Sequence, residues 1–401
     1  MTVGELPIGR RVAQWRVQRR MSQQVFADRL GKSKSWVDKV ERGVRALDRL
    51  SVIEEIAEVL RIDPVVLLGR DTPPAAATTS GLVDGVDGVR AALARHDVFR
   101  TGVEAPPLPP VDEVARLVGH GWLAYQHAHY PQLVRMLPDL LDTARRCHTP
   151  RAERSAELLV QAYRLTSSVL VKLGDAGLAW LAADRAMAVA AEDPVVAATA
   201  AVPLGQALRA LGRGRLAMTA ALAAANRIAP AVPREVPPGE SVVCGALLLQ
   251  AALAAVDCGD DRSVAELLDR AADLADRVGD GHDHHQTSFG PTVIELARVL
   301  TAAELGDTAD ALRRHASVTR RDSWRRLPAE YRAAHLIDTA RAYLRLGDLP
   351  GAGRLLVEAD RTAPAEVRCR PVARTVLAEV YRSGPEAAGV ARLAAAVGLT
   401  R

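Results

Sequence analysis

A short segment of the chain, residues 31–43 (GKSKSWVDKVERG), concentrates side chains that bind anions. It contains Lys32, Lys34 and Lys39, although the whole chain of 401 residues has only one other lysine, Lys172. Elsewhere arginine carries the positive charge. An ammonium group is a flexible point charge that donates hydrogen bonds to a phosphate or to the O6 and N7 acceptors of guanine. Three of them within eight residues indicate a surface for a polyanion; the alternative is the ordinary solvated face of a small domain.

The basic charge of the chain is concentrated near its N-terminus. Residues 1–70 contain 14 Lys and Arg against 9 Asp and Glu, a net charge of +5, and residues 1–45 alone carry 11 against 4, a net charge of +7. The remaining residues have 38 basic and 39 acidic side chains, so they are nearly neutral. A small basic segment attached to a neutral body predicts a polyanionic partner at one end of the protein.

Short helices are predicted to hold these basic residues in place. Five of them are expected within residues 8–69, over residues 8–20, 23–30, 34–42, 50–60 and a last short helix that opens at Asp63-Pro64. Ser22 is a good N-cap for the second helix, and Gly31 ends it as a glycine just beyond its last turn. Ser33 then caps the third helix, which Gly43 closes. Two helices joined by a three-residue turn, Gly31-Lys32-Ser33, are thereby predicted at the lysine cluster.

The segment IGRRVAQWRVQRRMSQQVFADRLGKSKSWVDKVERG resembles the Cro/cI-type family of bacterial repressors, often called XRE-type. The resemblance includes a Ser-Gln opening of the second helix and a Glu-x-Gly end of the third. It implies a five-helix, lambda-repressor-like domain with a helix-turn-helix, and double-stranded DNA as its partner. In such domains the second helix of the motif enters the major groove and its first residues reach base edges. In this frame, DNA binding is favoured over a merely solvated face for the three lysines.

The resemblance also implies roles for individual residues. Those expected to contact DNA are Gln23 at the start of the second helix, Lys32 in the turn, Ser33, Lys34, Ser35 and Lys39 on the recognition helix, and Arg42 and Arg45 after it, where phosphate contacts are expected. Family members often have a small apolar residue at the position of Lys32, so this side chain is expected to turn outward to the DNA backbone. Arg16 and Glu41 match a buried ion pair that joins the first helix to the third.

Other side chains of the segment are expected in its core or at its edge. The core positions are Ala27, Leu30, Val37 and Val40. Trp36 is equally compatible with stacking along a sugar and with packing at the edge of the domain.

The rest of the chain is predicted to be an array of paired helices. A Pro-rich linker with a possible short helix near residues 86–99 is expected over 71–110, and helices of 12–20 residues follow from residue 111 to the end. Glycine-containing turns recur at Gly174, Gly212, Gly259, Gly306 and Gly347, with spacings of 38, 47, 47 and 41 residues. A turn that repeats at this period predicts stacked helical repeats.

The unit around Gly347 resembles the tetratricopeptide repeat closely. Its matching residues are Leu336, Ala340, Tyr343, Ala352, Leu356, Ala359 and Pro364. The unit around Gly212 keeps Gly205, Leu208, Ala217, Ala224 and Pro230, and the other units are degenerate. The predicted fold class is therefore all-α, with a DNA-binding domain over 1–70 and a tetratricopeptide-like α-solenoid over 111–401. A generic helical bundle is the alternative for the second part.

Residues 279–291 (GDGHDHHQTSFGP) contain His282, His284 and His285 beside Asp283. Closely spaced histidines in a glycine-rich loop are a weak metal signal without distant ligands, so a polar loop between repeats is favoured. A long loop at one edge of a helical array can also line a binding face. The four cysteines, Cys147, Cys244, Cys258 and Cys369, are scattered and predict neither a zinc site nor a disulfide framework.

No sequence pattern points to catalysis or to a membrane. The sequence has no nucleophile elbow, Walker loop, HExxH or paired-carboxylate motif, so no enzyme activity, metal or cofactor is predicted. It has no N-terminal signal segment and no run of 18 apolar residues, which predicts a cytoplasmic protein.

The two parts together predict a sequence-specific transcriptional regulator. Its repeats are expected to sense a peptide or small molecule, or a partner, and to hold a homodimer together. The arrangement resembles regulators of Gram-positive bacteria in which tetratricopeptide-like repeats bind a short peptide pheromone, and the Arg and Ala richness indicates an actinobacterium. The alternative function is an interaction scaffold whose repeats bind a protein, with DNA binding secondary. An antitoxin-like repressor is a weaker possibility, because such proteins rarely need 290 further residues.

Overall fold

The computed structural model describes residues 8–19, 21–45, 47, 50–60, 67, 75–95, 108–149, 152–190, 193–229, 238–281, 284–383 and 389–399. Within these ranges the chain is helical and contains no strand, which confirms the predicted all-α class. Contacts divide the chain into two compact units, residues 1–74 and residues 75–401.

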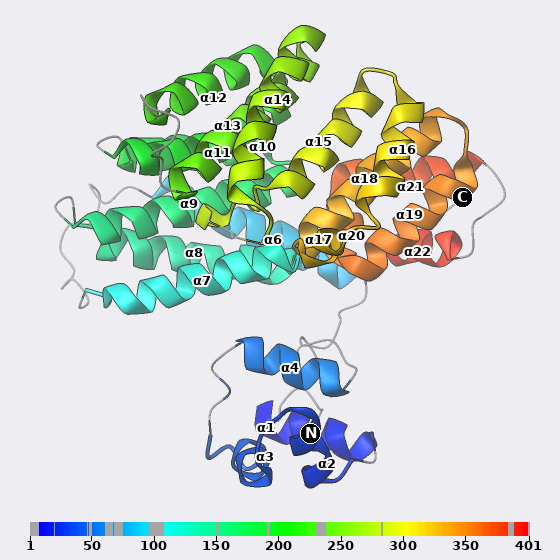
Figure 1. Ribbon diagram of the computed structural model, residues 1–401. Coiled ribbons are helices and arrows are strands. Elements are labelled where there is room, and N and C mark those ends of the chain that lie inside the picture. Colours follow the sequence, from blue (N-terminus) through cyan, green and yellow to red (C-terminus); the bar gives the residue numbers. More distant parts are fainter. Residues whose placement is uncertain are drawn as a thin grey trace. The chain divides into compact units, whose positions relative to one another are not determined.

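The first unit is a bundle of short helices, drawn in blue in Figure 1. Its described helices are α1 (Ile8–Gln18), α2 (Gln23–Arg29), α3 (Lys34–Glu41) and α4 (Leu50–Leu60). Their inward faces form one apolar core from Val12, Phe26, Ala27, Val37, Ile53, Ile56, Ala57, Leu60 and Leu67. The short helix predicted to open at Asp63-Pro64 lies outside the described residues, apart from the buried Leu67.

Local sequence determines the turn between α2 and α3, as predicted. The side-chain oxygens of Ser22 and Ser33 each accept a hydrogen bond from the backbone N–H three residues later, at 3.2 and 3.1 Å. These bonds satisfy donors that the first turn of a helix leaves unpaired. Gly31 has a φ of +62°, in the left-handed region that side chains rarely adopt, so it ends α2 and redirects the chain.

The second unit begins with three helices and continues as an array of helix pairs (Figure 1). The first three are α6 (Ala75–Ala94), α7 (Val111–Gln126) and α8 (Tyr130–Cys147). The pairs are α9 (Glu153–Leu173) with α10 (Ala176–Val189), α11 (Pro194–Ala210) with α12 (Gly214–Ile228), α13 (Pro238–Asp257) with α14 (Asp261–Val278), α15 (Pro291–Glu304) with α16 (Thr308–Val318), and α18 (Ala329–Arg345) with α19 (Leu349–Thr362). The 3-10 turn η3 (His284–Gln286) precedes α15, α17 (Asp322–Arg326) precedes α18, and α20 (Pro364–Cys369), α21 (Pro371–Ser383) and α22 (Val390–Ala396) follow α19. Packing within and between successive pairs makes the array tetratricopeptide-like, as predicted.

The turn inside each of these pairs contains one of the five recurring glycines. All five have φ between +68° and +95°. In four of the turns an aspartate follows the glycine and caps the next helix, as Asp348 does by accepting a hydrogen bond from the N–H of Gly351 at 2.8 Å. One helix therefore stops and the next starts after only two or three residues, which keeps each pair antiparallel and tightly joined.

The chain from residue 75 onward differs from the predicted linker over 71–110. Helix α6 has 20 residues and packs along α8, and Val89 and Leu93 are fully buried there. Its glycines disfavour a helix in isolation, but a Cβ on Gly85 would lie 2.6 Å from Cγ2 of Val134. The two helices approach each other at this glycine, so tertiary packing outweighs the weak local propensity.

The array closes on itself, because its first helices pack against its last ones. Helix α7 contacts α18, and both α8 and α9 contact α20. One continuous apolar core accordingly extends from Val89 to Val397, while the middle helices α11 to α15 form a second core. In Figure 1 the cyan α7 ends beside the orange helices of the C-terminal part.

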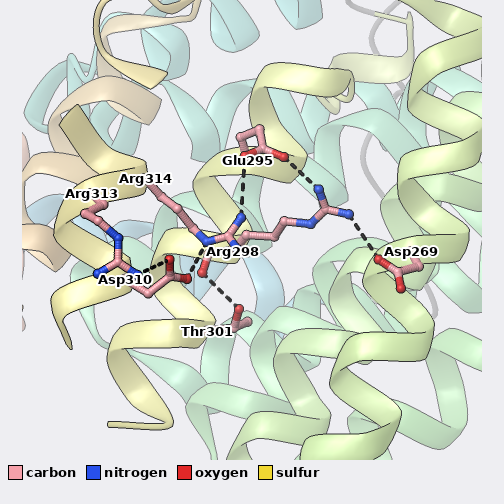
Figure 2. Close-up of polar contacts among 7 residues, drawn as sticks. All are labelled: Asp269, Glu295, Arg298, Thr301, Asp310, Arg313 and Arg314. Carbon is pink, nitrogen blue, oxygen red and sulfur yellow. Dashed lines mark hydrogen bonds and ion pairs between the residues drawn. The ribbon is translucent and has the colours of Figure 1, made fainter. Parts of the chain in front are cut away.

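Ion pairs join α14, α15 and α16 at the surface (Figure 2). Arg298 on α15 donates to Glu295 at 2.7 Å and to Asp269 on α14 at 3.1 Å. Arg314 on α16 lies 3.9 Å from Glu295 and also bonds Asp310, and that hydrogen bond lowers the pKa of the Asp310 carboxyl. Such exposed pairs add little stability one by one, but together they set the position of α15 between its neighbours.

One described segment, Gly239–Asp257 in α13, is long and apolar enough to cross a membrane. However, 78% of it is buried inside the second unit, where Val243 and Leu247 are completely covered by neighbouring helices. Its apolar character is accounted for by its place in the core of the array, so it is weak evidence for a membrane span.

Candidate nucleic-acid interface

Helix α3 exposes the residues that were predicted to face DNA. Those in solvent are Lys32, Ser33, Lys34, Ser35 and Lys39. The opposite face of α3 is buried, with Val37 and Val40 in contact with the first unit's interior. Among the described residues no carboxylate pairs with any of the three ammonium groups. Their charge is therefore available to a polyanion.

A buried ion pair connects α1 to α3. Arg16 donates to both carboxylate oxygens of Glu41, at 2.6 and 3.0 Å, and its third bond goes to the carbonyl of Met21 at 2.7 Å. The two charged side chains are only 12% and 7% exposed. Arg16 thus has a structural position and does not point toward the exposed face of α3.

Gln23 extends this pair instead of pointing outward. Its side-chain amide donates to Oε2 of Glu41 at 2.8 Å, and the side chain is half-buried. A phosphate or base contact was predicted for Gln23, and it stays a prediction. To make that contact, the Gln23 amide would have to leave Glu41 and bond to DNA instead.

The two arginines after α3 both have partners at the surface. Arg42 pairs with Asp38, one turn earlier, at 2.6 Å, and both side chains are largely exposed. The guanidinium of Arg45 lies 6.0 Å from the ring centroid of Trp36. Trp36 itself is half-buried and packs against the core of the first unit, so in this structure it lies at the edge of the domain.

Residues 7–68 match the family model described as "Helix-turn-helix domain". The N-terminal unit is a helix-turn-helix domain. The matched range contains α1 to α4 and every residue that was predicted to contact DNA. α2 and α3 are the two helices of the motif, and α3 is the one whose exposed N-terminal turn corresponds to the groove-reading position.

Comparison of the whole chain with curated proteins found no match. Similar solved structures include PlcR from Bacillus thuringiensis in complex with the peptide PapR7 and DNA, with 11% identity, a TM-score of 0.37, and coverage of 78% of this chain and 94% of that one. Aspartyl phosphate phosphatase F from Bacillus subtilis is another, with 10% identity, a TM-score of 0.44, and coverage of 90% and 94%. Likenesses this distant do not establish a function for this chain.

The histidine-rich loop has no metal-binding arrangement in its described part. His282 and Asp283 lie outside the described residues, and among those described no three His, Cys, Asp or Glu side chains gather around one point. His285 has a φ of +57°, and its carbonyl accepts a hydrogen bond from Arg164 on α9 at 2.6 Å. The loop therefore crosses to the beginning of the array. The four cysteines are free thiols.

A buried polar cluster in the second unit was missed by the sequence reasoning. Lys172 on α9 donates to Glu330 on α18 at 2.7 Å and to Glu366 on α20 at 2.8 Å. Arg370 bonds the other oxygen of Glu366 at 2.6 Å, and the hydroxyl of Tyr130 donates to Glu366. The only available signal was Lys172 itself, the single lysine outside the first unit, in an otherwise apolar last turn (VLVKL) of its helix.

Opposite charges keep Lys172 and Glu366 ionised in spite of their burial. Burial alone would lower the pKa of Lys172, but Glu330 and Glu366 outweigh it and raise that pKa. Burial likewise favours neutral Glu366, yet Lys172 and Arg370 hold its pKa below the ordinary value. A buried ion pair of this kind depends on every partner, so it ties the first helices to the last at one position.

Proposed function

We propose that this protein is a sequence-specific transcriptional regulator of the cytoplasm, which binds DNA through α3 and receives a ligand in its helical repeats. The observation that carries the proposal is the unpaired ammonium face of α3 inside a helix-turn-helix domain. Lys34 and Ser35, in the first turn of α3, are the residues assigned to base edges, and Lys39, Arg42 and Arg45 are assigned to phosphates.

The contacts that Arg42 and Arg45 make in the free protein do not oppose this assignment. An exposed ion pair such as Arg42–Asp38 contributes only about 0–1 kcal/mol, so a phosphate competes with it easily. The stacking of Arg45 on Trp36 is also at the surface, and it leaves the guanidinium N–H groups free to turn toward an anion. The Arg16–Glu41 pair has the complementary role of holding α3 in a fixed orientation on α1.

The active form is proposed to be a homodimer held together by the second unit. One recognition helix reads about four or five base pairs, which is too few to select a site in a genome. A two-fold dimer reads two half-sites about 34 Å apart, or a multiple of that distance. The second unit has 327 of the 401 residues and therefore offers most of the surface for such an interface.

The test is DNA footprinting of the purified full chain on genomic fragments, followed by gel shifts on the best site. Lys34→Ala should relax the preference for that site by about 1–3 kcal/mol, whereas Arg45→Ala should weaken specific and unrelated DNA alike. Arg10→Ala, which removes an exposed charge from α1, is the matched control. If no fragment is protected, this proposal is wrong and the interaction scaffold becomes the favoured alternative.

A further inference from the structure

The second unit contains a pocket of about 390 Å³ at the place where the array closes. It is lined by the C-terminal end of α7, by the connection between α14 and α15, and by α17 with the first turn of α18. Pockets that bind small ligands have volumes of roughly 300–1,000 Å³, so this one suits a small molecule or the last residues of a peptide.

Two arginines line this pocket without a partner. Among the described residues, neither Arg326 nor Arg332 has a side-chain hydrogen bond or an ion pair. The Nε of Arg332 is completely buried and unbonded, and burial lowers the pKa of this guanidinium, an effect that Glu358 only partly offsets. A half-buried guanidinium whose Nε has no hydrogen-bond acceptor is unfavourable, so a ligand that supplies a carboxylate improves the site.

The single carboxylate in the described lining does not neutralise these arginines. Asp280 accepts hydrogen bonds from the backbone N–H and the hydroxyl of Thr292, at 3.0 and 2.7 Å, and so holds the first turn of α15. With two arginines against one committed carboxylate, the charged side chains of the described lining carry a net positive charge.

One part of the pocket wall is apolar, beside the polar side chains of Gln126, His127, Ser288 and Ser323. It is formed by Phe289 from the connection before α15 and by Leu327, Pro328 and Ala329, which lead into α18. We propose that the pocket binds an amphipathic anion, with its carboxylate on Arg326 and Arg332 and its apolar body against this wall. A carboxylate matches the planar fork of an arginine, which accounts for the type of head group.

A ligand in this position would contact both ends of the array at once. The pocket residue Ser288 belongs to the connection that is anchored to the first helices, by Arg164 on the carbonyl of His285 and by a 2.9 Å hydrogen bond between Gln126 and Gln286. Arg326 and Arg332 belong to the last part of the array. Occupancy therefore stabilises the closed array. A regulatory role for the ligand rests on the proposed function, but the binding site itself does not.

Isothermal calorimetry of the full chain tests the site without DNA. The probes are 4-phenylbutyrate with its uncharged amide, and the tripeptide Leu-Leu-Phe with its C-terminal amide. The first pair represents free organic acids and the second peptide termini. At least one acid should bind at least about tenfold more tightly than its amide, as expected for a charge-assisted hydrogen bond.

Variants assign the binding to this pocket. The variants Arg332→Gln and Arg326→Gln should each weaken the binding of the acid by about tenfold. Arg325 is an exposed neighbour outside the lining, so Arg325→Gln should leave this binding unchanged. Arg326 is exposed, so Arg326→Gln should fold normally even if Arg332→Gln does not. Thermal melts followed by circular dichroism check the folding of each variant. The inference is overturned if neither acid binds at millimolar concentration, if acid and amide bind equally, or if Arg326→Gln and Arg332→Gln bind as the parent does. DNA binding that persists in any of these cases leaves the proposed function intact.

Discussion

Glu41 joins three helices of the first unit through its bonds to Arg16 and Gln23. Replacement of Arg16 by Ala leaves this buried carboxylate with the neutral amide of Gln23 alone. We expect a loss of about 3–5 kcal/mol in the stability of the first unit, because an unpaired buried charge is strongly unfavourable. The double variant Arg16→Met with Glu41→Leu should recover most of the loss, since it removes both charges together.

Hydrogen exchange measured by mass spectrometry on the full chain gives the local readout for these variants. Peptides from α1 and α3 should exchange much faster in Arg16→Ala, and peptides from α9 should not change. Equal protection of α1 in the parent and in Arg16→Ala would show that the ion pair does not stabilise the unit.

The residues of the candidate interface differ in how far the sequence alone predicts them. Ser22, Ser33 and Gly31 act on backbone within three residues, so their type and spacing were sufficient. The bond between Gln23 and Glu41 joins residues 18 positions apart. Residue spacing alone does not decide whether the Gln23 side chain makes this bond or turns toward solvent. Lys172 bonds Glu330 and Glu366 across 158 and 194 residues, and only the closure of the array places these three side chains together.

At the scale of single elements, α16 and α18 meet at a buried pair of histidines. Nδ1 of His315 lies 3.0 Å from Nε2 of His335, and the hydroxyl of Thr339 lies beside both rings. Burial lowers the pKa of His315 to about 4, and burial together with the neighbouring His315 lowers that of His335 to about 3. Both values are below the ordinary pKa, so the unfolded chain takes up protons more readily than the folded one.

Stability should therefore fall as the pH decreases from about 6.5 toward 4, by up to about 2 kcal/mol per histidine at pH 5. Burial raises the pKa of Glu330 and Asp338, and these groups act in the opposite direction. The informative quantity is thus the difference between the parent and His335→Gln, which keeps a hydrogen-bonding side chain but does not titrate. Urea unfolding at pH 7 and pH 5 should show a smaller drop for the variant; equal drops would rule out this pair as a source of acid sensitivity.

Helix α7 offers a second comparison, between two glycines that are separated by a single residue. A Cβ on Gly119 would meet nothing within 4 Å, so Gly119→Ala should stabilise the second unit by up to about 1 kcal/mol through helix propensity. A Cβ on Gly121 would lie 2.5 Å from Cδ2 of the buried Leu165 on α9. Gly121→Ala should instead destabilise by about 1–3 kcal/mol, because the core has no room for the added methyl. Melting temperatures that shift in the same direction for both variants would contradict the described packing of α7 on α9.

The elements themselves were predicted well where the local signals agreed. Helix α4 has the predicted bounds, and the five glycine turns lie at the recurring positions. Helix α6 was expected to be mostly linker, because two prolines directly before it and its threonines and three glycines weaken local helix propensity. What the sequence did not reveal is that Gly85 allows α8 to approach, so burial of Val89 and Leu93 stabilises a helix that propensity alone disfavours.

For the whole molecule, DNA binding is expected to depend steeply on salt. The net charge of +7 in residues 1–45 predicts that each first unit neutralises about four to six phosphates. The logarithm of the binding constant should then fall with the logarithm of the salt concentration, with a slope near −0.9 for each phosphate contact. A dimer doubles the number of phosphate contacts. The number of subunits that the salt slope implies should therefore match the number that light scattering gives. A flat salt response, or a monomer in the presence of its DNA site, would contradict the proposed mode of binding.

The ion cluster at Lys172 also determines how the second unit unfolds. In an open array each repeat touches only its neighbours, so the end repeats fray first and melting spreads inward. Here Lys172 on α9 is bonded to Glu366 on α20, and a shared core encloses both ends, so no terminal repeat is free to open alone. The second unit should therefore lose its structure in one cooperative transition. Its folding should be slow for an all-helical domain, because residues 194 positions apart must come into contact before the array is closed.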